Sequence, residues 1–131
     1  MEAQEFLRVV TLRKGKLKRS EFMLREREKG LSLFAYQVKP NPLEVIEAVR
    51  AAGKQGDLAV AIISGRQLHA LGLTLVRTPG GTPEAEVNAT HYEARLSFLR
   101  RLVLRLRGFS GHDYFNDHLS LKLCALARVL D

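Results

Sequence analysis

Tryptophan is absent from this sequence of 131 residues, and cysteine occurs once. A single cysteine excludes an intramolecular disulfide and the multi-cysteine sites that hold structural zinc. Cys124 lies within the apolar run 123–126, so we expect a small buried hydrophobic side chain there rather than a reactive thiolate. A chain of this length buries enough surface to form a core without metals or disulfides.

Long hydrophobic runs are also missing. No apolar run reaches the roughly 18 residues that a membrane-spanning helix needs. Residues 1–5 include two glutamates and no apolar signal-peptide core, so we expect a cytoplasmic protein. Hydrophobic residues make up 46% of the chain and charged residues 27%, values that exclude wholesale disorder.

The chain shows no internal repeat, low-complexity tract or interdomain linker, so we expect residues 1–131 to form one domain. Strand patterns occur at 5–13, 31–36, 57–63 and 73–76. The clearest helix follows Asn41, a favoured N-cap, with Pro42 at the first helical position. We predict an α/β or α+β domain, with a mixed sheet of about 4–5 strands and about 3–4 helices.

The second half of the chain contains one clear helix and one ambiguous segment. From the N-cap Ser110 onward, Phe115, Leu119, Leu123, Leu126 and Leu130 recur at helical spacing and predict a C-terminal amphipathic helix. Segment 90–107 fits two patterns: alternation typical of a strand begins at its first residues, and helical spacing covers its later ones. We favour a helix there, because Thr90 and Glu93 match a capping box.

Positive charge is concentrated in two zones. The chain carries 21 Lys and Arg against 14 Asp and Glu, a formal net charge of +7. Residues 95–107 contain five arginines and no acidic residue, and residues 1–30 hold a second basic zone. Guanidinium groups bind phosphate or carboxylate in a bidentate manner. The candidate binding residues are Arg95, Arg100, Arg101, Arg105 and Arg107, with Lys16, Lys18 and Arg19 from the second zone.

We therefore predict a non-catalytic binding or accessory protein that engages RNA, DNA or an acidic protein partner through segment 95–107. No RNA-recognition aromatic pattern, zinc-finger spacing or helix-turn-helix accompanies it. We do not expect a membrane partner, because only Phe98 and Phe109 lie near the segment as aromatic anchors. An alternative role is a structural subunit, in which the leucine-rich C-terminal helix docks on a second copy or on a larger assembly.

A further alternative is a small enzyme of nuclease or transferase type. His91 follows a Gly/Pro-rich turn and would serve as a general base, with Glu93 orienting it. His112 and His118 lie in a polar segment with two aspartates, residue types that bind metals or transfer protons. The two histidines are six positions apart and so lie on different faces of a helix, and we expect neither a metal nor a cofactor.

Known catalytic motifs are missing. Gly80 and Gly81 are not followed by a Walker lysine, so we interpret them as a flexible turn. The order Arg8, Ser32 and Glu93 loosely resembles the Arg–Ser–Glu layout of some ADP-ribosyl transferases. No Ser-Thr-Ser cluster follows the second strand and the chain is short, so this resemblance assigns no family.

Overall fold

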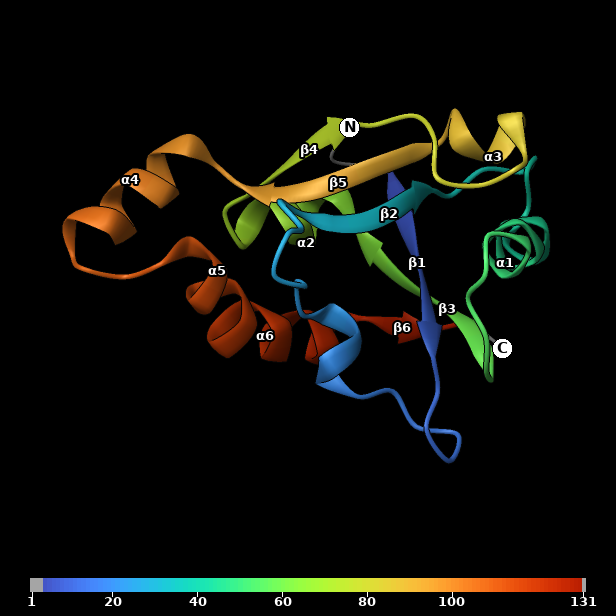
Figure 1. Ribbon diagram of the computed structural model, residues 1–131, viewed down its shortest axis with the longest axis horizontal. Helices are drawn as coiled ribbons and strands as arrows, with labels where there is room; N and C mark the ends of the chain where they lie inside the picture. The colour runs from blue at the N-terminus through green and yellow to red at the C-terminus, as the bar shows by residue number, and fades with distance from the viewer. Residues whose placement is uncertain (1–3, 131) are drawn as a thin grey trace.

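The computed structural model describes residues 4–130, which form one sheet with helices on both faces (Figure 1). The six strands run in the order β4-β5-β2-β1-β3-β6, and all neighbouring pairs are antiparallel. Their bounds are β1 Glu5–Thr11, β2 Leu31–Ala35, β3 Leu58–Ser64, β4 Leu73–Arg77, β5 His91–Leu96 and β6 Arg128–Val129. The sequence left α/β and α+β open, and the structure is α+β; the sheet is antiparallel rather than mixed and has one strand more than expected.

The helices are short. In chain order they are η1 (Arg19–Phe22, 3-10), α1 (Pro42–Ala51), α2 (Gly65–Ala70), α3 (Ala85–Asn88), α4 (Phe98–Leu106), α5 (Gly111–Tyr114), η2 (Phe115–Leu119, π) and α6 (Ser120–Leu126). The predicted N-cap of α1 is confirmed, because the Asn41 side chain accepts a hydrogen bond from Glu44 N at 2.9 Å. Ser64 caps α2 in the same way and accepts from Gln67 N at 3.0 Å.

Alternation along the strands builds a core on each face of the sheet. On one face, Phe6 and Val10 of β1 pack with Phe115 and Leu123 of the C-terminal helices. On the other face, Leu7 and Val9 pack with Val45 and Ala48 of α1 and with Val87 of α3. Because successive strand residues point to opposite faces, one strand serves both cores.

The helix predicted over 90–107 is wrong for its first part. Residues 91–96 form β5, whose Ala94 and Leu96 are buried, and the helix starts only after Ser97. The Ser97 side chain, rather than that of Thr90, accepts the capping bond, from Arg100 N at 3.2 Å. Thr90 instead donates from Oγ1 to the Val87 carbonyl at 2.8 Å. Pairing with β2 on one side and β4 on the other stabilises β5 as a strand. The capping pattern depends only on neighbouring residues and so cannot predict this pairing.

The C-terminal helix also differs from its prediction. Ser110 caps it and Phe115, Leu119 and Leu123 are buried, as expected. However, η2 is a π-helical turn, α6 ends at Leu126, and β6 then pairs with β3 at the edge of the sheet. An edge strand offers unpaired backbone groups, and β6 covers part of this edge at Ala61 and Ile62 of β3.

Strands β1 and β2 separate soon after they meet. β1 pairs with β3 over seven residue pairs, but with β2 it pairs only through Phe6 and Leu7. The chain between these strands forms a tight turn at 13–16, then η1, and then an irregular stretch before β2. This connection forms one wall of the pocket described below.

Candidate functional site

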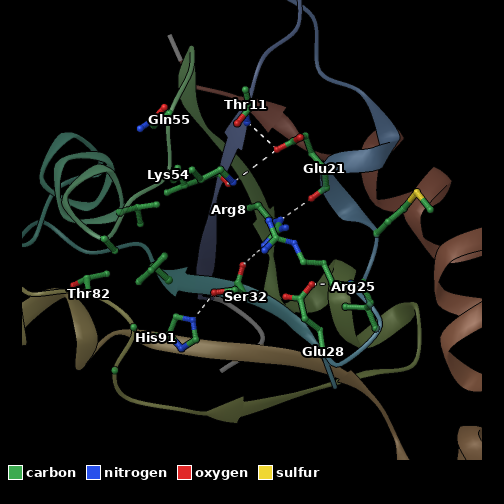
Figure 2. Close-up of a pocket in the computed structure, with 18 of the residues that line it drawn as sticks. Arg8, Thr11, Glu21, Arg25, Glu28, Ser32, Lys54, Gln55, Thr82 and His91 are labelled. Atoms are coloured by element: carbon green, nitrogen blue, oxygen red, sulfur yellow. Dashed lines mark hydrogen bonds and ion pairs between the residues drawn. The ribbon is translucent and has the colours of Figure 1, made fainter.

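A pocket of about 750 Å³ opens where β1 and β2 diverge (Figure 2). Its walls come from β1 and β2, the connection 20–28, the end of α1 with residues 54–55, the glycine turn 80–82, and the first residue of β5. Its charged and polar lining residues are Arg8, Thr11, Ser20, Glu21, Arg25, Glu28, Ser32, Lys54, Gln55, Thr82 and His91.

Arg8 lies at the centre of this pocket and ties two walls together (Figure 2). Its Nε donates to the Glu21 carbonyl at 2.8 Å, and its Nη1 donates to the Ser32 carbonyl at 2.9 Å. Burial lowers the pKa of Arg8 to about 10, while the charges of Glu28 and Glu21 act in the opposite direction. The guanidinium therefore stays protonated at neutral pH and supplies a fixed positive charge.

Lys54 adds a second cation beside Arg8. Its Nζ donates to the Val9 carbonyl at 3.0 Å and lies 3.8 Å from Oε1 of Glu21, which also accepts from Thr11 N at 2.8 Å. Burial lowers the pKa of Lys54, and the charge of Arg8 lowers it further. With Arg25, the lining holds three cations against the carboxylates of Glu21 and Glu28, a composition that favours an anionic ligand.

Ser32 and His91 form the most specific feature of the pocket. Ser32 Oγ is hydrogen-bonded to Nε2 of His91. On the other side of the ring, Nδ1 lies 2.7 Å from the Thr78 carbonyl oxygen and 2.9 Å from Thr78 Oγ1. A carbonyl oxygen can only accept, so Nδ1 carries a proton. In the neutral ring, Nε2 then accepts the Ser32 hydroxyl proton.

The histidine is held from several sides. Its ring packs edge-on against Phe34 with a centroid distance of 5.1 Å. Thr78 N donates to the His91 carbonyl at 3.0 Å, which joins the Gly80–Gly81 turn to β5. At the far end of this turn, Asn88 accepts from Thr82 N at 3.0 Å and donates to the Thr82 carbonyl at 2.8 Å. The turn that we expected to be flexible is therefore anchored at both ends.

A hydroxyl, a base that accepts its proton and a group that orients the base are the three parts of an activated nucleophile. Here Ser32, His91 and the Thr78 carbonyl supply them in one pocket wall. Proton transfer from Ser32 would leave an imidazolium, whose Nδ1–H stays hydrogen-bonded to the Thr78 carbonyl. The cations near Ser32 would attract the negative charge of a substrate.

The structure assigns Glu93 a different partner from the one we predicted. Arg95 donates to Glu93 Oε1 from Nε at 2.9 Å and from Nη2 at 2.5 Å, and Glu93 does not line the pocket. The Thr78 carbonyl, rather than the Glu93 carboxylate, orients the His91 ring, so the predicted role of Glu93 is wrong. The Arg–Ser–Glu layout is likewise incomplete, because only Arg8 and Ser32 meet in the pocket.

The two histidines of the second candidate pair have different partners. Nε2 of His112 lies 2.6 Å from the Arg25 carbonyl, which fastens the pocket wall to α5. The exposed His118 instead packs on the ring of Tyr114, at 5.3 Å between centroids. Over residues 4–130, no group of three or more His, Cys, Asp or Glu side chains is placed to hold a metal ion.

The candidate residues of the two basic zones lie on different parts of the molecule. Four of the candidate arginines, Arg100, Arg101, Arg105 and Arg107, are exposed on or directly after α4. Lys16 and Lys18 lie in the turn region after β1, at the opposite side of the molecule from α4 in Figure 1. Arg19 donates to the Asn116 carbonyl at 3.3 Å. Lys16 and Lys18 therefore do not join the arginines of α4, whereas Lys29 of the same N-terminal zone lines a hollow with Arg95, Arg101 and Arg105.

Sequence reasoning overlooked Thr78 and Lys54, and it named Arg8 and Ser32 only for their order. A usable signal existed in the two strands. Arg8 interrupts the apolar run of β1 and Ser32 that of β2, and a polar residue within a buried strand needs a specific partner.

Comparisons of this chain with protein-family models, with curated proteins and with solved structures gave no match. Within the described part of the chain, no helix has the length and apolar character required to cross a membrane. The assignment of function therefore depends on the geometry of the molecule itself.

Proposed function

We propose that this protein is a small enzyme that transfers an acyl or phosphoryl group through Ser32, acting on an anionic substrate. The observation that carries this proposal is the hydrogen-bonded series Ser32–His91–Thr78 in a pocket that contains Arg8 and Lys54. This proposal differs from the binding role that we predicted from the sequence. Hydrogen bonds that fix the tautomer of His91 are a more specific indication of function than an excess of positive charge.

In the proposed reaction, Ser32 Oγ attacks the electrophilic carbon or phosphorus while Nε2 of His91 takes the hydroxyl proton. The bond from that centre to the leaving group breaks, and the leaving group takes the proton back from Nε2. Water or a second substrate then attacks the same carbon or phosphorus while Nε2 of His91 takes its proton. The bond to Ser32 Oγ breaks, Oγ takes the proton back from Nε2, and the product leaves. Arg8 and Lys54 hold the anionic part of the substrate.

A fluorophosphonate probe tests this directly, because it modifies an activated serine without knowledge of the substrate. Ser32 Oγ forms a bond to phosphorus, fluoride leaves, and His91 takes the proton. We expect a single adduct by intact mass, located at Ser32 by peptide mapping. Ser32→Ala should abolish the adduct, and His91→Asn should slow its formation by roughly 100-fold, the lower range for a general base.

Ser20 provides a matched control, because it is another serine that lines the same pocket. Ser20→Ala should react like the unmodified protein, and circular dichroism should confirm that each variant folds. Pyrophosphate should protect Ser32 from the probe, and Lys54→Gln should weaken that protection. Failure of the folded protein to react at Ser32 within hours at millimolar probe, or equal reaction in His91→Asn, would refute the proposal.

A further inference from the structure

Helix α4 exposes its apolar face, which in most amphipathic helices packs against the core. Phe98, Leu99 and Leu106 are 73%, 68% and 79% exposed, and Leu102 and Val103 are also exposed. Leu104 alone among the helix residues is half-buried and packs against the core. The amphipathic pattern predicted here is present, but its apolar face points outward.

The charged residues of α4 flank this apolar face on both sides. At about 100° per residue, the five exposed apolar side chains cover an arc of roughly 140°. Arg100 and Arg107 follow at one border of the arc, and Arg101 and Arg105 lie at the other border. None of these four arginines forms an ion pair with any residue of the described chain.

The apolar arc and its flanking arginines fit some binding partners better than others. A second copy of the chain would bring two sets of four arginines together, and like charges repel. A nucleic acid would meet one row of arginines and leave the apolar arc in water. An anionic bilayer surface accepts both features at once, because the apolar arc enters the headgroup boundary and both rows of arginines reach lipid phosphates.

The position of α4 in the molecule and its exposed aromatic residues also fit a membrane surface. Figure 1 places α4 at the extreme end of the molecule, so a flat surface can reach it without meeting the sheet. The two aromatic residues that we judged too few to anchor a membrane, Phe98 and Phe109, are 73% and 59% exposed and line one hollow together with Leu102. We propose that α4 with Phe109 is a docking element for an anionic membrane surface.

Vesicle co-sedimentation tests this proposal independently of the Ser32 pocket. We expect binding to phosphatidylcholine vesicles with 30 mol% phosphatidylserine to be at least tenfold tighter than to phosphatidylcholine alone in 50 mM salt. Leu102→Ser/Leu106→Ser should lose at least tenfold in affinity for the anionic vesicles. Arg100→Gln/Arg105→Gln should remove the preference for the anionic lipid.

Matched controls come from elsewhere on the surface. Leu121→Ser removes another exposed leucine, on α6, and Lys16→Gln/Lys18→Gln removes two charges from the turn region; both should bind like the unmodified protein. No co-sedimentation in 50 mM salt would overturn the proposal. Equally strong binding to RNA or to polyglutamate, unchanged by Leu102→Ser/Leu106→Ser, would also overturn it and would assign α4 to polyanions in general.

Discussion

Asn116 connects the C-terminal helices to the pocket wall, and its removal provides a quantitative test of this structure. Its Oδ1 accepts from Leu24 N at 2.6 Å, and its Nδ2 donates to the Leu24 carbonyl at 3.0 Å. One side chain thus reproduces both hydrogen bonds of a β-bridge. Leu24 is 7% exposed, so few water molecules can replace these bonds.

Asn116→Ala should leave one backbone N–H and one carbonyl of Leu24 without a partner. Each such buried group costs about 1–3 kcal/mol, and partial hydration at the pocket edge places the sum at about 2–4 kcal/mol. A domain of this size loses roughly 4 °C in Tm per kcal/mol, so we expect Tm to fall by about 10 °C. Because Leu24 and Arg25 line the pocket, reaction of Ser32 with the probe should also slow.

Urea unfolding followed by circular dichroism measures this difference. The exposed neighbour Asp117 supplies the control, and Asp117→Ala should change the free energy of unfolding by less than about 0.5 kcal/mol. The m-value should stay constant, so that the midpoint alone reports stability. A loss below about 1 kcal/mol for Asn116→Ala would show that Leu24 finds other partners and would refute this account of the contact.

The variant Asn116→Asp separates hydrogen bonding from volume. An ionised carboxylate accepts from Leu24 N but repels the Leu24 carbonyl, whereas a protonated carboxyl donates to it. The repulsion raises the pKa of this carboxyl in the folded state, so the stability deficit of Asn116→Asp should shrink as the pH falls toward about 4, the ordinary pKa of an aspartate, and should be smallest below it. A deficit that does not change with pH would contradict the proposed pairing.

Two further predictions follow from side chains whose pKa is displaced. Burial and Arg8 lower the pKa of Lys54, so its amine should become acylated by acetic anhydride at lower pH in the folded protein than in urea. Competitive labelling followed by mass spectrometry measures this difference, and identical pH profiles in the two states would contradict the pocket environment of Lys54. Burial raises the pKa of the Cys124 thiol, whose sulfur lies 3.9 Å from the Leu17 carbonyl oxygen. Iodoacetamide at pH 8 should therefore modify the thiol slowly in the native state and quickly in urea, and equal rates would show that the thiol is not shielded.

Local patterns predicted local structure well. The Asn41 and Ser110 caps and the apolar strand in 57–63 depend on neighbouring residues, and the structure confirms them. Segment 90–107 was predicted less well, because a capping pattern and an alternating pattern overlap there. Pairing partners decided the outcome: β5 lies between β2 and β4, and both are distant in sequence from its first residues.

The sequence by itself determined a single class of mixed helices and strands, the caps at Asn41 and Ser110, the basic character of 95–107 and the lack of known catalytic motifs, and the antiparallel pairing of the strands then made the class α+β. Only the tertiary structure brought Ser32 to His91, 59 positions apart, and turned the apolar face of α4 outward. Spacing along a chain specifies which residues share a face of one element. The geometry between elements depends on strand register and core packing over long separations, which no local pattern encodes.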